Sequence, residues 1–247
     1  KGQYAITAKG AFHGRTLGAL SLNRSKGVYR RDFPEIAGVH DTPFCTDRSC
    51  TPESCDCGFF FDDTSWLRQM LGSGGYVDPG EVAYLILEPI QGEGGYRFPS
   101  DSFMAEIAAV VDVHALTLVA DEIQAGLGRT GEFWASDHSP IEPDVITSAK
   151  GLPVGATIGT EAAFPDERGR ISSTWGAGDL LSSMQGALTI DVIEDENLMR
   201  NAVERGEQFR DALEQASHDC LVDVRGTGLL LAVEFDTKRN RDAVQEA

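Results

Sequence analysis

The sequence predicts an α/β protein with a mixed, mostly parallel sheet between layers of helices. Three short segments carry this prediction, and each ends at a charged residue: Glu81–Leu87 before Glu88, Leu116–Ala120 before Asp121, and Asp144–Ala149 before Lys150. The first two are largely apolar. Strands that are apolar on both faces are typical of parallel sheets covered on both sides. Because ligands of open α/β sheets bind beyond the carboxyl ends of the strands, we expect the three charged residues at one edge.

The segments between these strands complete the α/β pattern. Residues 100–114 carry apolar side chains at helical spacing, with Ser100 or Asp101 available as the cap, which predicts a right-handed crossover helix from Glu88 to Asp121. We also expect strands at 4–7 and 153–159, a short helix at 63–71, a helical region at 180–217 broken near 194–197, and two strands within 222–235. The predicted division is a large domain, 1–190, without its first part, and the beginning of a truncated small domain, 191–247.

The composition is strongly acidic. The net charge is −18, and only five of the 21 basic residues are lysine. Such a surface repels nucleic acids and anionic membranes, and the chain has no run of about 18 apolar residues, so neither partner is expected. Strong acidity also keeps proteins hydrated in concentrated salt, which favours a halophilic source; an ordinary acidic cytoplasmic enzyme is the alternative.

An amine and a carboxylate at one strand edge suit few cofactors. Pyridoxal phosphate is one of them, because its aldehyde needs a lysine and its ring nitrogen stays protonated only beside an acid. The strand ends alone leave a second interpretation open, since most acids and lysines at such positions belong to solvated loops.

Four motifs in order strengthen the cofactor interpretation. They are Phe-His-Gly-Arg-Thr (12–16), Glu-Pro-Ile-Gln-Gly-Glu-Gly-Gly (88–95), Asp-Glu-Ile-Gln-Ala-Gly-Leu-Gly-Arg-Thr-Gly (121–131) with Pro143–Leu152 downstream, and Arg-Gly-Thr-Gly-Leu (225–229). Together they resemble the class III aminotransferases, the pyridoxal-phosphate enzymes of the ornithine, acetylornithine and 4-aminobutyrate type. The resemblance implies a fold-type-I transferase and covers nearly the whole chain.

The resemblance also implies roles for residues near the cofactor. Lys150 would carry pyridoxal phosphate as a Schiff base and then act as the catalytic base, while Asp121 pairs with the ring nitrogen. Gln124 would donate to the phenolic oxygen of the ring. Phe12 and Ile123 would pack on its two opposite faces.

Three more residues are expected at the cofactor. His13 and Glu88 belong to the motifs that surround it, and Thr174 lies in a segment similar to Ser-Thr-Phe-Gly-Gly-Asn-Pro of the family. In relatives this threonine binds the cofactor phosphate of the neighbouring subunit. The resemblance therefore implies a homodimer with shared active sites.

The implied reaction is transfer of an amino group from an ω-amino donor to a 2-oxo acid such as 2-oxoglutarate. Arg15, Glu93 and Arg225 are the expected substrate-binding residues. Glu93 and Arg225 would pair when an ω-amino donor enters, and they would separate when Arg225 binds the α-carboxylate of glutamate. After Lys150-Gly151-Leu152, a link of two residues, Pro153-Val154, stands where the family pattern has several glycines.

Two functions other than amino transfer stay open. They are an aminomutase or racemase of the same fold, and an inactive structural relative that a metal ion stabilises.

Four of the five cysteines lie within thirteen residues. Cys45, Cys50, Cys55 and Cys57 could bind a structural zinc ion, because four thiolates satisfy its tetrahedral coordination. The spacing lacks the paired Cys-x2-Cys knuckles of common zinc sites. Disulfides and reduced thiols without metal are the two alternatives, and the motifs of the resemblance do not include this cluster.

Overall fold

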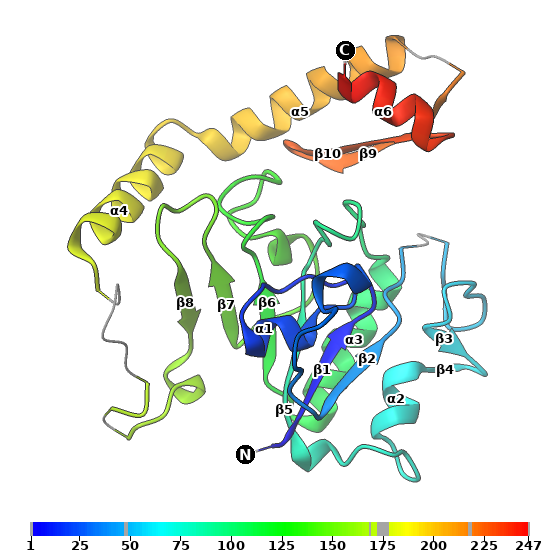
Figure 1. The fold of residues 1–247 in the computed structure, drawn as a ribbon, viewed down its shortest axis with the longest axis vertical. Coiled ribbons are helices and arrows are strands. Elements are labelled where there is room, and N and C mark those ends of the chain that lie inside the picture. Colours follow the sequence, from blue (N-terminus) through cyan, green and yellow to red (C-terminus); the bar gives the residue numbers. More distant parts are fainter. Residues whose placement is uncertain (1, 47–48, 168, 172–177, 217–218, 247) are drawn as a thin grey trace.

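The computed structural model describes residues 2–46, 49–167, 169–171, 178–216 and 219–246. Its main sheet has the order β2-β1-β5-β6-β7-β8 (Figure 1), and all neighbours are parallel except the antiparallel pair β7–β8. The predicted mixed, mostly parallel sheet is thus confirmed. The strands are β1 (Tyr4–Ala8), β2 (Val39–Thr42), β5 (Val82–Leu87), β6 (Leu118–Asp121), β7 (Val145–Ser148) and β8 (Ala156–Gly159).

Both faces of the sheet are covered. On one face, α3 (Asp101–His114) buries Phe103, Met104, Ile107 and Val110 against side chains that include Leu85 and Leu87 of β5. The intervening residue Ile86 points to the other face, where it packs with Leu22 of α1 (Leu17–Leu22). This alternation along β5 explains why the strand is apolar throughout.

The crossover helix begins where the sequence predicts it. Ser100 is the N-cap of α3, and its hydroxyl accepts a hydrogen bond from the Phe103 N–H at 3.2 Å. The helix ends at Ala115, which adopts a left-handed backbone conformation with φ of 49°. From there the chain enters β6 and leads to Asp121.

The short helix predicted at 63–71 starts later than expected. Residues 60–65 form a two-stranded hairpin of β3 (Phe60–Phe61) and β4 (Thr64–Ser65), and only Trp66–Leu71 forms α2. Asp62 and Asp63 make the turn with φ of 51° and 57°, a left-handed region that aspartate tolerates better than most residues. This prediction was wrong because an Asp-Asp turn competes with the first helical turn.

The C-terminal part contains α4 (Leu180–Asp195), α5 (Leu198–Gln215), the antiparallel pair β9 (Leu221–Thr227) and β10 (Leu230–Phe235), and α6 (Lys238–Glu246). The predicted break in the helical region is confirmed at Asn197, which has a φ of 52°. The predicted domain boundary at 190 falls inside α4 and stays a prediction. No helix among the described residues has the length and apolar character needed to cross a bilayer.

Candidate active site

Three strands bring charged residues to one edge of the sheet. Glu88 directly follows β5, Asp121 is the last residue of β6, and Lys150 lies two residues after β7. In the sheet Asp121 lies opposite Thr147, three residues before Lys150. Glu88 and Asp121 are each 6% exposed, whereas Lys150 is exposed and has no hydrogen bond or ion pair with another described residue. The expected gathering of the three residues is therefore observed.

His13 contacts the carboxylate of Asp121 on its buried side. The Nδ1 atom of His13 lies 2.8 Å from Oδ2 of Asp121, and both side chains are buried. The other ring nitrogen lies 3.3 Å from Oγ1 of Thr7, and the backbone N–H of His13 donates to Oδ1 of Asn23 at 2.7 Å. The N–H of Ile123 donates to Oδ1 of Asp121 at 3.2 Å. Asp121 is thus fixed in one orientation at the sheet edge.

Glu88 joins two loops to the end of β5. Its Oε1 accepts a hydrogen bond from the Phe12 N–H at 2.9 Å, and its Oε2 accepts one from the Gly92 N–H at 2.8 Å. Burial raises the pKa of Glu88, and these two N–H donors counteract part of that rise. The loop with Phe12 is therefore tied to the same edge as Asp121.

Gln124 lies against Gly92, and any larger residue at position 92 would push the Gln124 side chain away. Its Nε2 donates to Oη of Tyr96 at 3.2 Å. A Cβ atom on Gly92 would lie only 2.0 Å from Oε1 of Gln124. The glycine in the 88–95 motif therefore leaves room for the Gln124 amide.

Glu93 and Arg15 both contact Tyr29. Lys26 Nζ donates to Oε1 of Glu93 at 2.6 Å, and the Tyr29 hydroxyl donates to the same oxygen. The hydrogen bond from Lys26, followed by that from Tyr29, lowers the pKa of Glu93. The Arg15 guanidinium lies 4.5 Å from the Tyr29 ring centroid and 5.6 Å from that of Phe12. Glu93 thus binds residues of the segment that follows α1, Lys26 and Tyr29.

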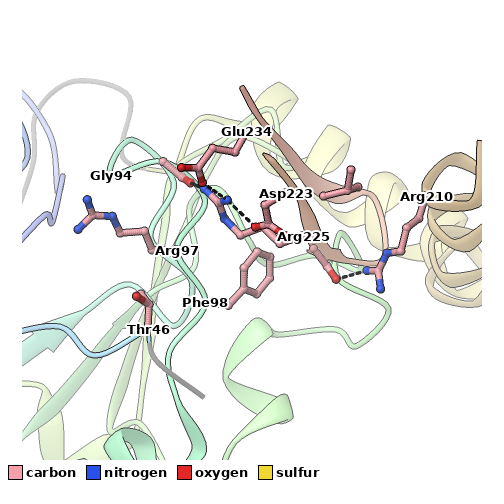
Figure 2. Close-up of a pocket in the computed structure, with 11 residues that line it drawn as sticks. Thr46, Gly94, Arg97, Phe98, Arg210, Asp223, Arg225 and Glu234 are labelled. Carbon is pink, nitrogen blue, oxygen red and sulfur yellow. Dashed lines mark hydrogen bonds and ion pairs between the residues drawn. The ribbon is translucent and has the colours of Figure 1, made fainter. Parts of the chain in front are cut away.

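Arg225 reaches from β9 to the loop after β5. Its Nη1 contacts Oδ2 of Asp223 at 2.8 Å and Oε2 of Glu234 at 2.6 Å. Its Nε and Nη2 donate to the carbonyls of Tyr96 at 3.1 Å and Gly95 at 3.0 Å. Figure 2 shows the contacts of Arg225 with Asp223 and Glu234 in a groove of about 820 Å³, which the residues of the sheet edge do not line.

The expected ion pair between Glu93 and Arg225 is not formed in this structure. Each residue has partners of the opposite charge closer to it, which are Lys26 for Glu93 and two acids for Arg225. The two side chains nevertheless belong to one neighbourhood, since Arg225 binds carbonyls only two and three residues beyond Glu93.

A family model described as "Aminotransferase class-III" matches residues 1–247. The chain belongs to the class III aminotransferases. A lysine aminotransferase from M. tuberculosis is 30% identical in sequence, with a TM-score of 0.81 over 98% of this chain. An ornithine aminotransferase from Toxoplasma gondii ME49 is 28% identical, with a TM-score of 0.77 over 97% of this chain. The chain spans about half the length of these relatives, 56% and 53%.

Several class III motif residues have partners that sequence analysis did not identify. Asn23, Lys26 and Tyr96 lie outside helices and strands, and Tyr29 ends a 3-10 helix of three residues, Gly27–Tyr29, so no periodic pattern in the sequence distinguished them. Thr174, expected at the cofactor phosphate, lies outside the described residues. The four clustered cysteines lie between β2 and β3, in a segment separate from the charged strand ends.

Proposed function

We propose that this chain forms much of the active site of a pyridoxal-phosphate-dependent aminotransferase. It would move an amino group from an ω-amino donor to a 2-oxo acid, with 2-oxoglutarate as the acceptor. The observation that carries the proposal is that adjacent strands place two groups at one edge: the exposed amine of Lys150, which has no ion pair among the described residues, and the buried, oriented carboxylate of Asp121. The family membership of the chain supports the same reaction.

The residues at the strand edge fit pyridoxal phosphate. The buried Asp121 suits a protonated ring nitrogen, and Lys150 offers the free amine that an aldehyde requires. The amide of Gln124, in the space left by Gly92, suits an oxygen on the ring. When bound, the cofactor supplies an aldehyde that takes up amino groups and a ring that withdraws electrons.

Each residue then has a defined task. Lys150 would hold the cofactor through its amine and, once that amine is free, would act as the general base that takes the proton from the substrate Cα. Asp121 would hold a proton on the ring nitrogen, while His13 keeps the Asp121 carboxylate oriented from its buried side. Phe12 and Ile123 would flank the ring.

Reduction with borohydride tests the assignment of Lys150. The complete protein loaded with pyridoxal phosphate should become labelled on the peptide that contains Lys150. Lys150→Ala should lose both label and turnover, whereas the matched control Lys238→Ala, at an exposed position of α6, should keep both. Label on any other lysine would refute the assignment. Turnover without transfer to 2-oxoglutarate would indicate an aminomutase or racemase, and no turnover with any donor would indicate an inactive relative.

We also propose that Glu93 and Arg225 control which substrate binds. The contacts of Arg225 with Asp223 and Glu234 are partly exposed, so a substrate carboxylate can exchange with them at small cost. A bidentate guanidinium contact would then hold the α-carboxylate of glutamate, with Arg15 at the distal carboxylate. For an ω-amino donor, Glu93 would leave Lys26 and cover Arg225.

Half-reaction rates test this exchange. Arg225→Ala should slow the glutamate half-reaction more than the ω-amine half-reaction, and Glu93→Ala should shift donor preference toward glutamate. Arg97→Ala is the matched control, because Arg97 lines the same groove and has no ion pair among the described residues (Figure 2). Equal losses in both half-reactions for both variants would contradict the exchange.

A homodimer with active sites shared between subunits is part of the proposal. It rests on the implied role of Thr174 and is supported by the apolar side chains that α4 exposes: Leu180, Leu181, Met184, Leu188 and Val192. Light scattering of the complete protein should give twice the mass of one chain. A monomer with full activity would exclude shared sites.

A further inference from the structure

The four clustered cysteines converge on one point. All four Sγ atoms lie within 4.8 Å of one another, and two of the separations are 2.9 Å, between Cys55 and Cys57, and 4.0 Å, between Cys50 and Cys57. A zinc ion with four thiolates at about 2.3 Å holds neighbouring sulfurs about 3.8 Å apart. The sulfurs are thus already arranged at nearly the size of a tetrahedral site.

We propose that Cys45, Cys50, Cys55 and Cys57 bind a single zinc ion that fastens the segment between β2 and β3 to the large sheet. This site is independent of the aminotransferase reaction proposed above. Four soft thiolates in tetrahedral arrangement select zinc or iron among common metals. A cluster of several irons would spread its ligands over separate ions, which suits a set this compact less well.

The segment between β2 and β3 has little regular structure that could hold it in place. Between Thr42 and Phe60, apart from residues 47–48, its regular structure is limited to an isolated bridge between Thr51 and Ser54. Loops of this length without secondary structure are uncommon in compact domains unless something else orders them. A metal ion with four ligands along the segment supplies that order without a hydrophobic core of its own.

The surroundings of the sulfurs favour a structural role for the metal. Cys45 and Cys50 are 0% and 2% exposed and belong to the same core cluster as Phe59 and Phe103, while Cys57 packs against it. Nothing in this arrangement provides an open ligand position of the kind that catalytic zinc sites keep. The ion would therefore have a structural role and not a catalytic one.

Backbone contacts connect the proposed site to the crossover helix. The N–H of Ser100, the N-cap of α3, donates to the carbonyl of Cys45 at 2.9 Å, and the Ser102 hydroxyl donates to the carbonyl of Cys50. The N–H of Phe60 donates to Sγ of Cys55 at 3.5 Å, a contact that suits a thiolate ligand. Metal binding would thereby stabilise the start of α3, the helix that leads to Asp121.

Metal analysis of the complete purified protein is the first test. We expect one zinc per chain, and titration of the thiols with a mercurial should release it in step with four of the five cysteines. Zinc well below one per chain, iron in its place, or fewer than five thiols after denaturation without reductant would each overturn the proposal. The last result would mean disulfides.

Variants assign the site to these residues. Cys50→Ser and Cys57→Ser should lose the zinc, whereas the control Cys220→Ser, which changes the one cysteine outside the cluster, should keep it. Cys57→His preserves a zinc ligand and should retain the metal, which separates ligation from mere packing. Cobalt-substituted protein should show the intense visible bands of tetrahedral thiolate coordination. Retention of zinc by both serine variants, or octahedral cobalt spectra, would refute the assignment.

Discussion

Replacing Asp121 with asparagine removes the negative charge of the side chain and keeps its size and shape. The amide keeps an oxygen for the Ile123 N–H, and its NH2 group can donate to Nδ1 of His13 if the imidazole proton moves to the nitrogen 3.3 Å from Thr7. Both hydrogen bonds of the side chain therefore survive a change of tautomer. We expect the free energy of unfolding to change by no more than about 1 kcal/mol, the value of one neutral hydrogen bond.

The catalytic effect of Asp121→Asn should be much larger. A hydrogen bond between charged groups contributes about 1.5–3 kcal/mol, so its loss at the ring nitrogen lowers the rate by about 10- to 150-fold. Loss of the proton from the ring would add to this, because the ring then withdraws electrons less well. About 10-fold is thus the smallest loss we expect in kcat for transfer to 2-oxoglutarate.

Asp144→Asn is the matched control for this measurement. Asp144 lies at the other end of the same strands, where its Oδ2 accepts a hydrogen bond from the Leu118 N–H at 2.8 Å. Turnover of Asp144→Asn should stay near that of the unchanged protein, while its thermal stability falls. If Asp121→Asn kept normal kcat with bound cofactor, Asp121 would be a structural residue only.

Three further changes test other parts of the structure. Gly92→Ala should displace the Gln124 amide and weaken cofactor binding in absorbance titrations, with only a small change in melting temperature; unchanged affinity would contradict this geometry. Glu122→Ala should lower the urea unfolding free energy by about 2–6 kcal/mol, because two buried N–H groups, of Ala135 and Ser136, lose their acceptor. If the acidic surface is a halophilic adaptation, the melting temperature should rise up to molar potassium chloride, where the Debye length is about 3 Å; equal stability in dilute buffer would exclude this.

The buried Glu122 also predicts a pH dependence. Burial raises the pKa of Glu122 above the ordinary value of 4.5, so the folded protein binds the proton more tightly than the unfolded chain. Its contribution to stability is complete below pH 4.5 and is lost as the pH rises through the raised pKa. Glu122→Gln removes this titration, so the stability of the unchanged protein relative to the variant should fall as the pH rises through that range. A constant difference would refute it.

Local patterns in the sequence were sufficient for five of the six strands of the main sheet and for its charged edge. An apolar run followed by a charge marks β5 and β6, because a strand buried on both faces must end where a polar group can reach the crevice. The strand β7, Val-Ile-Thr-Ser, is less apolar and is likewise followed by a charge, Lys150. The cap of α3 and the break at Asn197 were also visible, since both depend on residues within one helical turn. The strand β2, the helix α1 and the turn at Asp62-Asp63 were not predicted. The sequence of β2, Val-His-Asp-Thr, is mostly polar, and at 62–63 an Asp-Asp turn takes the place of the first turn of the expected helix.

Contacts between distant segments required the tertiary structure. His13 meets Asp121 across 108 positions, and Arg225 reaches the Tyr96 carbonyl across 129. Such pairs depend on how strands are ordered in the sheet, and no period or motif encodes that order locally. The cysteines illustrate the same limit: their spacing left zinc, disulfides and free thiols open, and only the folded path of an irregular segment brings all four sulfurs within 4.8 Å.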